Sequence, residues 1–450
     1  MPSDVEISAA DYHQLGSHPS ATRIFSLAAV ALVSGIANGY NGFVLEGALP
    51  RLHALVDTEI KLSVFETGLI GGALSLGGFI GSLACTEIAY RLSRRHMVVV
   101  GEAVIIASVL AFACASSFMT ILIGRIATGF GVGICGLAKP LIVSEQSPPH
   151  MRGLLVSLFA VGQSIGLNIF YITDWALPPL TVAWAWRVLV ALGATPAIVV
   201  VGLALSGAAP ASAYWDVPPS RVVESAAGAS IKSEAPHRQL VALLTVEPRE
   251  VRRNFGLVLA LMLGYNLSGT LVIANYAGEI FASAGAAGRD LPIVVGVVQF
   301  LGLLSAAAFS DRLGRRPLLL MSCALTAACL YLIAVLIGNQ TVLAPALGGV
   351  FTPALLTLIV AVEYAVGAGL NPIRIVLSAE LMPNKYRSLG MALGNAVGWG
   401  LALVSLFLFP VLTKMLGGPA PQFAFFGSTV ALLTLLLVWQ LPETRGIDFG

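Results

Sequence analysis

Long apolar runs, each ended by proline, glycine or charged residues, follow one another along almost the whole chain. Each run reaches the roughly 20 residues that a helix needs to cross a bilayer. Six lie in the first half, at 24–45, 64–88, 97–117, 119–143, 153–174 and 186–206. Six more lie in the second half, at 255–284, 291–309, 317–337, 350–380, 388–413 and 421–441. The pattern predicts an all-α membrane protein with twelve transmembrane helices in two pseudo-symmetric six-helix bundles.

A polar segment divides the two sets of spans. Residues 207–250 are rich in Ala, Ser and Pro and carry several charges, which is typical of a linker with short surface helices. The N-terminal segment is polar and no small-residue cleavage site follows the first apolar run, so we expect the first span to remain in the mature protein. The expected organisation is a tail at 1–22, a bundle at 23–206, a linker at 207–252, a second bundle at 253–441 and a tail at 442–450.

Lys and Arg are distributed unevenly between alternate connections. Cytoplasmic loops retain basic residues preferentially, so this distribution predicts the orientation of the chain. One side holds Arg23, Arg91, Arg94, Arg95, Arg152, the linker, Arg312, Arg315, Arg316, Lys385, Arg387 and Arg445, and the other holds Arg51, Lys61, Arg187, Arg289 and Lys414. We therefore expect both termini and the linker in the cytoplasm, and the protein in the plasma membrane.

The composition excludes a soluble globular protein. Hydrophobic residues make up 57% of the 450 residues and charged residues 11%, with a mean hydropathy of +0.87, whereas soluble domains carry about 25% charged residues. The net charge of +2 and the short, separate basic clusters disfavour a nucleic-acid partner. The five cysteines lack the spacing of metal ligands and no phosphate-binding loop is present. We expect no metal, no cofactor and no enzymatic activity; the expected partners are a small-molecule substrate and the lipid bilayer.

The two halves repeat one arrangement of charges. An Arg-Arg pair lies at the start of one span, the next span ends in Glu, and Pro and Arg follow that Glu at three and seven residues. The residues are Arg94, Arg95, Glu145, Pro148 and Arg152 in the first half and Arg315, Arg316, Glu380, Pro383 and Arg387 in the second. Two parallel repeats indicate a secondary transporter whose site lies near the midplane between the halves. Salt bridges among these residues would hold the inner ends of each half together while the cavity opens outward.

Several motifs in these spans resemble the sugar porter family of the major facilitator superfamily, over about 20–450. They are Gly124-Arg125 with Gly129, Gly131 and Gly133; Pro140, Glu145, Pro148, Arg152 and Gly153; Trp186-Arg187; Asp311 to Arg316; and Pro442 to Gly446. The resemblance implies the twelve-helix facilitator fold and transport of a sugar or polyol by alternating access without ATP. It also implies that Asp311 and Glu443 join the gating salt bridges at the cytoplasmic ends.

The substrate positions depart from the family pattern. Ala160 stands where the family has a sugar-binding Gln, Tyr265-Asn266 replaces a Gln pair, and Ile375 replaces a Trp on which sugars stack. A pore needs hydrogen-bonding groups at membrane depth, where an unpaired polar group is costly. The candidate ligands are Asn38, Asn41, Gln163, Asn266, Asn275, Gln299, Asn395 and the aromatic Trp399. Any one of these amides is as well suited to joining helices as to binding a solute.

Asn41 bears on energy coupling. Proton-coupled relatives have Asp at this position of a Gly-Tyr-Asp motif, whereas this chain has Gly39-Tyr40-Asn41. An amide does not titrate, so facilitated diffusion is the simplest interpretation. Arg125, which would face that Asp, then needs another partner, for which Glu46 is the candidate. Glu46 and Glu363 remain alternative proton carriers, so proton-coupled symport stays open.

Two cations stand at equivalent positions of the repeat, because Lys139 lies six residues before Glu145 and Arg374 six before Glu380. Charges within the bilayer usually face a cavity or a partner. One interpretation, which we favour, pairs both cations with Glu363, Glu102 or other nearby carboxylates. The other makes them a binding site for a carboxylate or a phosphate ester.

The function favoured by these features is facilitated diffusion of a small polar solute, a sugar or polyol. The alternatives are an organic-anion carrier, a proton-coupled sugar symporter and a solute sensor that does not transport. A sensor usually needs a signalling tail, and the chain stops directly after its last motif, at Gly450.

Overall fold

Helices form every regular element in the part of the chain that the structure describes. The computed structural model describes residues 21–54, 62–92, 94–146, 151–178, 182, 184–205, 243–245, 247–283, 290–383 and 386–441. The expected linker and both tails lie almost entirely outside these residues. The predicted all-α membrane fold is confirmed.

The N-terminal half is built from six spans. They are α2 (Ala21–Ala54), α3 (Val64–Arg91), α4 (Arg94–Ala113), α5 (Phe118–Gln146), α6 (Arg152–Ala176) and a last span divided into α7 (Ala185–Leu192) and α8 (Ala194–Leu205). The first helix runs well beyond the expected end at residue 45, because Ala48, Leu49 and Leu52 are buried and continue its packing. A capping box of Ser63 and Glu66 begins α3.

The C-terminal half differs from the expectation by having breaks within two spans. Gly269, with a φ of +79°, separates α11 from α12, and the π-helical turn η2 separates α16 from α17. The runs at 255–284 and 350–380 are therefore not single helices. The elements are α11 (Arg249–Asn266), α12 (Thr270–Ser283), α13 (Leu291–Leu313), α14 (Arg315–Gly338), α15 (Gln340–Leu347), η1 (Gly348–Val350), α16 (Phe351–Ala365), η2 (Val366–Leu370), α17 (Asn371–Glu380), α18 (Arg387–Met415) and α19 (Ala420–Gln440).

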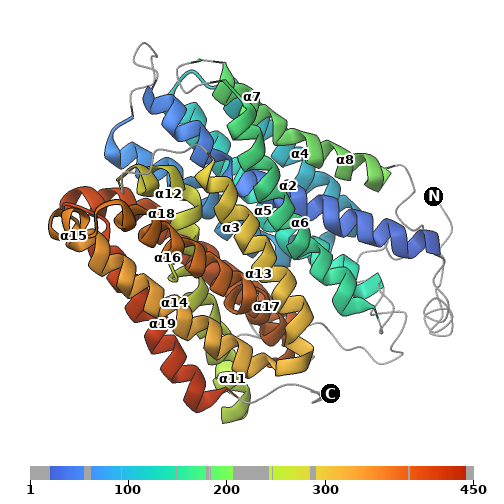
Figure 1. The fold of residues 1–450 in the computed structure, drawn as a ribbon. Helices are drawn as coiled ribbons and strands as arrows, with labels where there is room; N and C mark the ends of the chain where they lie inside the picture. Colours follow the sequence, from blue (N-terminus) through green and yellow to red (C-terminus); the bar gives the residue numbers. More distant parts are fainter. Residues whose placement is uncertain are drawn as a thin grey trace, which may run out of the picture.

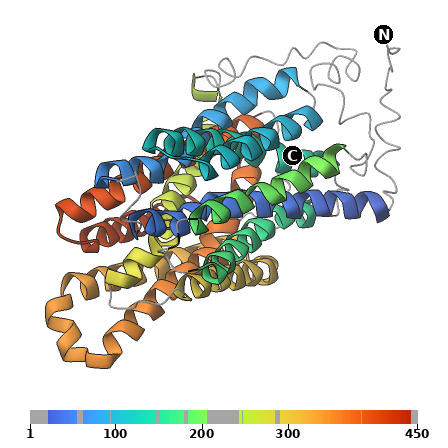
Figure 2. The same ribbon diagram turned by 90° about the horizontal axis from the view of Figure 1, so that it is seen from above.

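Each expected span has its counterpart in the helices of the described residues. Eleven helical stretches there are long and apolar enough to cross a membrane. The 25-residue helix α6 packs along α2 and occupies the remaining span, expected at 153–174. Figure 1 shows α2–α8, in blue to green, beside α11–α19, in yellow to red. Seen from above, the axes of most helices are broadly aligned with one another (Figure 2).

Glycines bring the helices of the N-terminal half into backbone contact. In α2 and α6 a Cβ atom on any of four glycines would overlap the backbone of the other helix: Gly35, Gly39, Gly162 and Gly166. The helices α3 and α5 interlock in the same way through Gly77, Gly81, Gly129 and Gly133. In each helix the glycines are four residues apart, so they lie on one face. Small residues at this spacing let backbones approach closely, which matters in lipid because no hydrophobic force drives helices together there.

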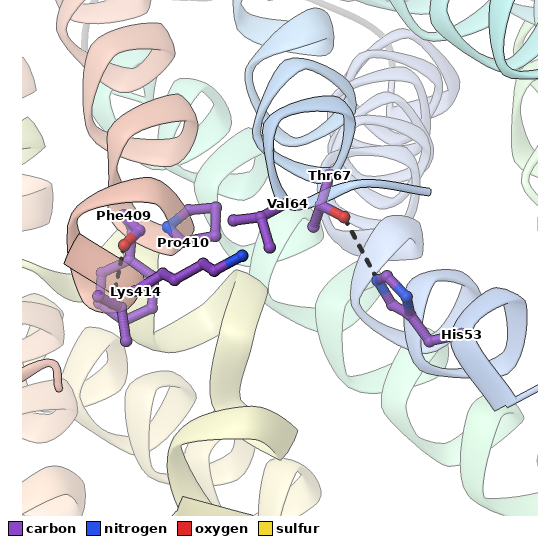
Figure 3. A pocket seen from close by; sticks show the side chains of 7 residues that line it. His53, Val64, Thr67, Phe409, Pro410 and Lys414 are labelled. Atoms are coloured by element: carbon purple, nitrogen blue, oxygen red, sulfur yellow. Dashed lines mark hydrogen bonds between the residues drawn. The ribbon is translucent and has the colours of Figure 1, made fainter. Parts of the chain in front are cut away.

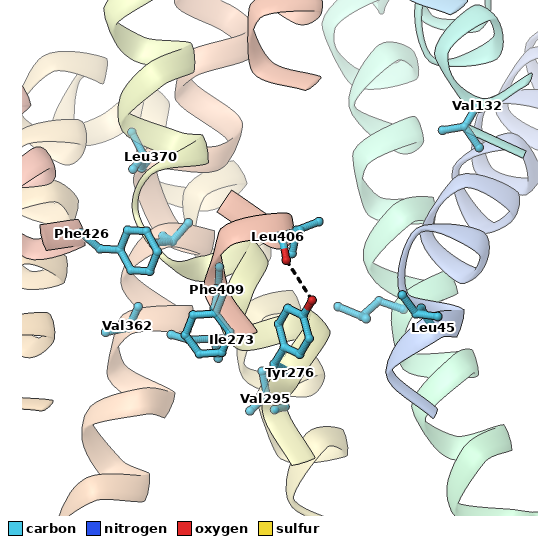
Figure 4. Close-up of a cluster of buried hydrophobic side chains, with 14 of the residues drawn as sticks. Leu45, Val132, Ile273, Tyr276, Val295, Val362, Leu370, Leu406, Phe409 and Phe426 are labelled. Carbon is cyan, nitrogen blue, oxygen red and sulfur yellow. Dashed lines mark hydrogen bonds between the residues drawn. The ribbon is translucent and has the colours of Figure 1, made fainter. Parts of the chain in front are cut away.

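The two halves meet along α3 and α18, α6 and α13, and α2 and α12. The hydroxyl of Tyr171 in α6 donates a hydrogen bond of 3.1 Å to the carbonyl oxygen of Ala274 in α12. Within the C-terminal half, the hydroxyl of Tyr276 donates to the carbonyl oxygen of Leu406 at 2.9 Å, beside the apolar cluster around Phe409 (Figure 4). Buried side chains therefore connect the halves and hold the kinked α12 against α18.

The backbone contact at Gly39 predicts a strong position dependence of glycine substitutions in α2. Gly39→Ala adds a Cβ atom that collides with the Gln163 backbone, whereas the Cβ atom of Gly42→Ala meets open space. Alanine improves helix propensity equally in both, by about 1 kcal/mol, so the difference isolates the contact. We expect Gly39→Ala to lower the melting temperature in detergent, at a cost of about 1–3 kcal/mol for overpacking, and Gly42→Ala not to lower it. Equal melting temperatures for the two variants would contradict this account.

Candidate functional site

The two asparagines of α2 have different environments. The Asn41 side chain is fully buried, and its Nδ2 donates at 2.9 Å to the carbonyl oxygens of Ala37 and Gly193. It therefore joins α2 to the break between α7 and α8, and its expected place in the polar ring stays a prediction. Asn38 is 5% exposed, and its Oδ1 has no hydrogen-bond partner. Asn41 Oδ1 also lacks a partner, so as acceptors the two asparagines differ only in that Asn38 is slightly exposed and Asn41 is not.

The asparagines beside the α11–α12 break bind the backbone of their own helices. Asn266 Nδ2 donates to the Met262 carbonyl oxygen at 2.8 Å, and Asn275 Nδ2 donates to the Leu271 carbonyl oxygen at 2.9 Å. Asn275 also lines a small cleft between α2 and α12, which Glu46 lines from the other side. The cleft brings one expected ligand and one expected proton carrier together across the two halves.

The remaining polar candidates lie on α6, α13 and α18. Gln163 of α6 is half-buried beside α2. Asn395 Nδ2 donates to Ser82 Oγ at 3.0 Å, and the ring of Trp399 covers Gly78 of α3. Asn395 and Trp399 thus connect the halves at α3 and α18, so their expected place in one polar ring with Gln163 remains a proposal.

Lys139 and Arg125 are both fully buried, and their partners differ from each other. Lys139 Nζ forms an ion pair with Glu102 of α4, which is also fully buried. This is one of the pairings that we favoured from the sequence. The Arg125 guanidinium donates to the carbonyl oxygen of Asn41 at 3.2 Å, and no acidic side chain of the described residues lies within 4 Å of it. The expected Arg125–Glu46 pair is therefore wrong, because Arg125 turns to the backbone of α2.

Glu363 of α16 is fully buried and is held by neutral donors. Its Oε1 accepts from Thr270 Oγ1 at 2.8 Å, and its Oε2 accepts from Gln299 Nε2 at 3.1 Å. Gln299 thus contacts a carboxylate, and its expected role as a substrate ligand stays a prediction. Neither Lys139 nor Arg374 pairs with Glu363, so that pairing is wrong.

Arg374 lies on α17 against α11. Its Nη1 is 3.2 Å from the Met262 sulfur, its Nη2 donates to Asn371 Oδ1 at 3.2 Å, and its guanidinium carbon lies 3.8 Å from the centre of the Tyr265 ring. No carboxylate of the described residues lies within 4 Å of it. The favoured pairing with a carboxylate is therefore wrong for this cation, and a cation–π contact takes its place.

The structure describes part of the proposed gate. Arg315 Nη2 lies 3.0 Å from Glu380 Oε1, which joins the start of α14 to the end of α17. Arg316 Nη2 donates to the Val438 carbonyl oxygen of α19 at 2.7 Å. The other expected gate side chains lie outside the described part of the structure: Arg94, Arg95, Glu145, Arg152, Asp311, Arg387 and Glu443.

Two features were missed by reasoning from the sequence. Arg51 of α2 forms an ion pair with Asp174 of α6, and the occurrence of one charge near the outer end of each span was the available signal. A cleft of about 300 Å³ opens between the start of α3 and the C-terminal part of α18, lined by His53, Val64, Thr67, Phe409, Pro410, Thr413 and Lys414. Figure 3 shows the Lys414 amine reaching across it toward Val64. By the predicted orientation this cleft lies on the outer face, away from the midplane.

Comparison with known proteins places these features in a family. The model of the family described as "Sugar (and other) transporter" matches residues 27–450. Polyol transporter 5 of Arabidopsis thaliana is 25% identical, over 94% of this chain and 84% of its own length. The galactose-proton symporter of Escherichia coli is also 25% identical, over 94% of this chain and 92% of its own.

The fold also matches solved structures of transporters. The inward-open conformation of the xylose transporter XylE from E. coli has a TM-score of 0.75 and 21% identity, covering 95% of this chain and 98% of that chain. This likeness supports the fold, and the family model extends over nearly all the sequence. This multi-pass membrane protein belongs to the sugar (and other) transporter family.

Proposed function

We propose that this chain carries a sugar or polyol across the plasma membrane by facilitated diffusion, with both termini in the cytoplasm. Family membership carries the transport function. Relatives named for polyols and for galactose support a polyhydroxylated solute. Alternating access between the two halves fits a site near the midplane, where Asn38, Gln163 and the amides beside the α11–α12 break supply hydrogen-bonding groups.

The environment of Asn41 supports uniport. An amide stands where a proton carrier would need a carboxylate, and it is held by two backbone carbonyl oxygens. Arg125 beside it donates to a backbone oxygen instead of to an acid. Neither the Asn41 amide nor the Arg125 guanidinium changes charge under physiological conditions, so a proton has no carrier there.

The coupling prediction is that uptake equilibrates the solute without concentrating it. In proteoliposomes with the wild-type protein, we expect internal sorbitol or galactose to reach the external concentration and an imposed proton gradient to leave that end point unchanged. Asn41→Asp would place a titratable group beside Arg125 and should make the uptake rate depend on pH.

Concentrative wild-type uptake that collapses with a protonophore would contradict uniport. Two matched variants would then locate the carrier. Loss of accumulation in Glu363→Gln, with retention in Glu46→Gln, would assign it to the carboxylate between Thr270 and Gln299, and the reverse result would assign it to the α2–α12 cleft.

The gate prediction concerns the Arg315–Glu380 ion pair. The two side chains are 24% and 26% exposed, so the pair is partly solvated and is worth at most about 1 kcal/mol. Glu380→Gln should therefore shift the population toward inward-open states by about two- to fivefold. The readout is the alkylation rate of Ser378→Cys, a position that is 1% exposed in the structure, in a background with the exposed Cys114 replaced.

A surface ion pair provides the matched control. Glu250 and Arg253 lie 3.9 Å apart and are both exposed, so Glu250→Gln removes an ion pair without touching the proposed gate. We expect this control to keep the wild-type alkylation rate. An unchanged alkylation rate in Glu380→Gln, or an equal change in both variants, would contradict the proposed role of the Arg315–Glu380 pair as a gate.

A further inference from the structure

Arg374 is a cation at membrane depth that no carboxylate of the described residues neutralises. It lies six residues, or about 9 Å along a helix, inside the cytoplasmic end at Glu380. Its nearest acceptors are the weakly accepting thioether of Met262 and the neutral amide of Asn371, and its buried Nε has no hydrogen-bond partner. The Tyr265 ring stacks on the guanidinium. All of these contacts are uncharged.

Two other cations in the described spans are neutralised by ion pairs with acidic side chains. Lys139 has Glu102, and Arg51 has Asp174. Lys139 is the counterpart of Arg374 in the repeat. Glu102 lies seven residues after Arg95, and the residue seven after Arg316 is Cys323. The second half of the repeat therefore has a cation at the position of Lys139 but no acid at the position of Glu102.

Arg125 also lacks an acidic partner, but it is 1% exposed and enclosed by packed helices. The Arg374 side chain is only half-buried, so it is more accessible than that of Arg125. Glu363 of the same span does not compensate it either, because it lies eleven residues away, about 16 Å along the helix axis, and binds Thr270 and Gln299.

The helices around Arg374 are interrupted on both sides of the contact. Tyr265 stands in the last turn of α11, just before the break at Gly269. Arg374 stands in the first turns of α17, just after the π-helical turn η2. Broken transmembrane helices and π-helical turns are frequent at binding sites, because the ends of the shorter helices adjust independently.

We propose that Arg374 binds the carboxylate of the transported solute, and that the substrate is a monoanionic sugar acid such as a uronate or an aldonate. The inference rests on the proposed function and narrows its substrate class. A carboxylate takes two parallel hydrogen bonds from a guanidinium edge, and the Tyr265 ring supports the guanidinium from its face. The Lys139 charge is already cancelled, so one negative charge on the solute balances the site, which disfavours a doubly charged phosphate ester.

The test compares matched acids and neutral sugars on the full-length protein. Thermal stabilisation of purified protein and counterflow in proteoliposomes are measured with D-galacturonate against D-galactose and with D-gluconate against D-sorbitol. We expect the wild type to bind each acid at least about tenfold more tightly than its neutral partner, in line with a charge-assisted hydrogen-bond pair. Arg374→Gln should lose this preference, and Arg374→Lys should retain part of it, because a point charge remains without the bidentate fork.

The matched control is another arginine stacked on an aromatic ring. Arg187 lies 4.4 Å over the Trp186 ring and donates to the carbonyl oxygens of Ala113 and Ala115, so Arg187→Gln removes a similar contact away from the proposed site. We expect it to keep the preference for acids. Should Arg374→Gln fail to fold, the wild-type preference and its reduction in Arg374→Lys still decide the proposal.

The outcomes separate this inference from the proposed function. Equal binding of acids and neutral sugars, no binding of any acid, or an unchanged preference in Arg374→Gln overturns the role of Arg374. Counterflow of neutral sugars with no preference for acids leaves the sugar transporter in place and overturns the sugar acid. Acid binding lost in Arg374→Gln but without counterflow supports the site and overturns transport.

Discussion

Charge at membrane depth is the constraint on which the rest of this structure depends. An ion removed from water needs an opposite charge or several hydrogen bonds inside the protein. In the N-terminal half the pairs Lys139–Glu102 and Arg51–Asp174 supply this between neighbouring helices. Each pair ties two helices together and fixes how they are rotated about their axes. In the C-terminal half Glu363 is satisfied by neutral donors, and Arg374 by an aromatic ring.

The backbone combines close helix packing with interruptions of individual spans. Glycines interlock α2 with α6 and α3 with α5 so closely that a single methyl group would disrupt either contact. The spans α11–α12 and α16–α17 are broken, by Gly269 and by a π-helical turn. Closely packed helices beside helices with such interruptions suit a carrier in which local bending at the site accompanies the larger movement. Arg374, the half-buried one of the two cations without an acidic partner among the described residues, lies beside these breaks.

Much of the fold could be predicted from the sequence, because apolar length alone identifies a membrane span. The Arg-Arg and Glu spacing also predicted the Arg315–Glu380 contact. The partners of the polar and charged side chains within the membrane spans could not be predicted. Asn41, Arg125 and Arg374 all bind groups other than those expected, because the partner depends on helix rotation and on breaks such as η2. Those properties arise from packing between residues far apart in the chain, and no local pattern encodes them.

The proposed binding of a carboxylate by Arg374 also connects substrate binding to occlusion of the site. With Arg374 resting on the Tyr265 ring, an occluded empty site encloses a net positive charge at low dielectric, which opposes the loss of its remaining water. A bound carboxylate removes that net charge, so the loaded site is the easier one to occlude. The differential free energy that a substrate needs to drive a conformational change then comes from one ion pair. In the proposed mode of binding, the solute supplies in the second half of the repeat the negative charge that Glu102 supplies in the first.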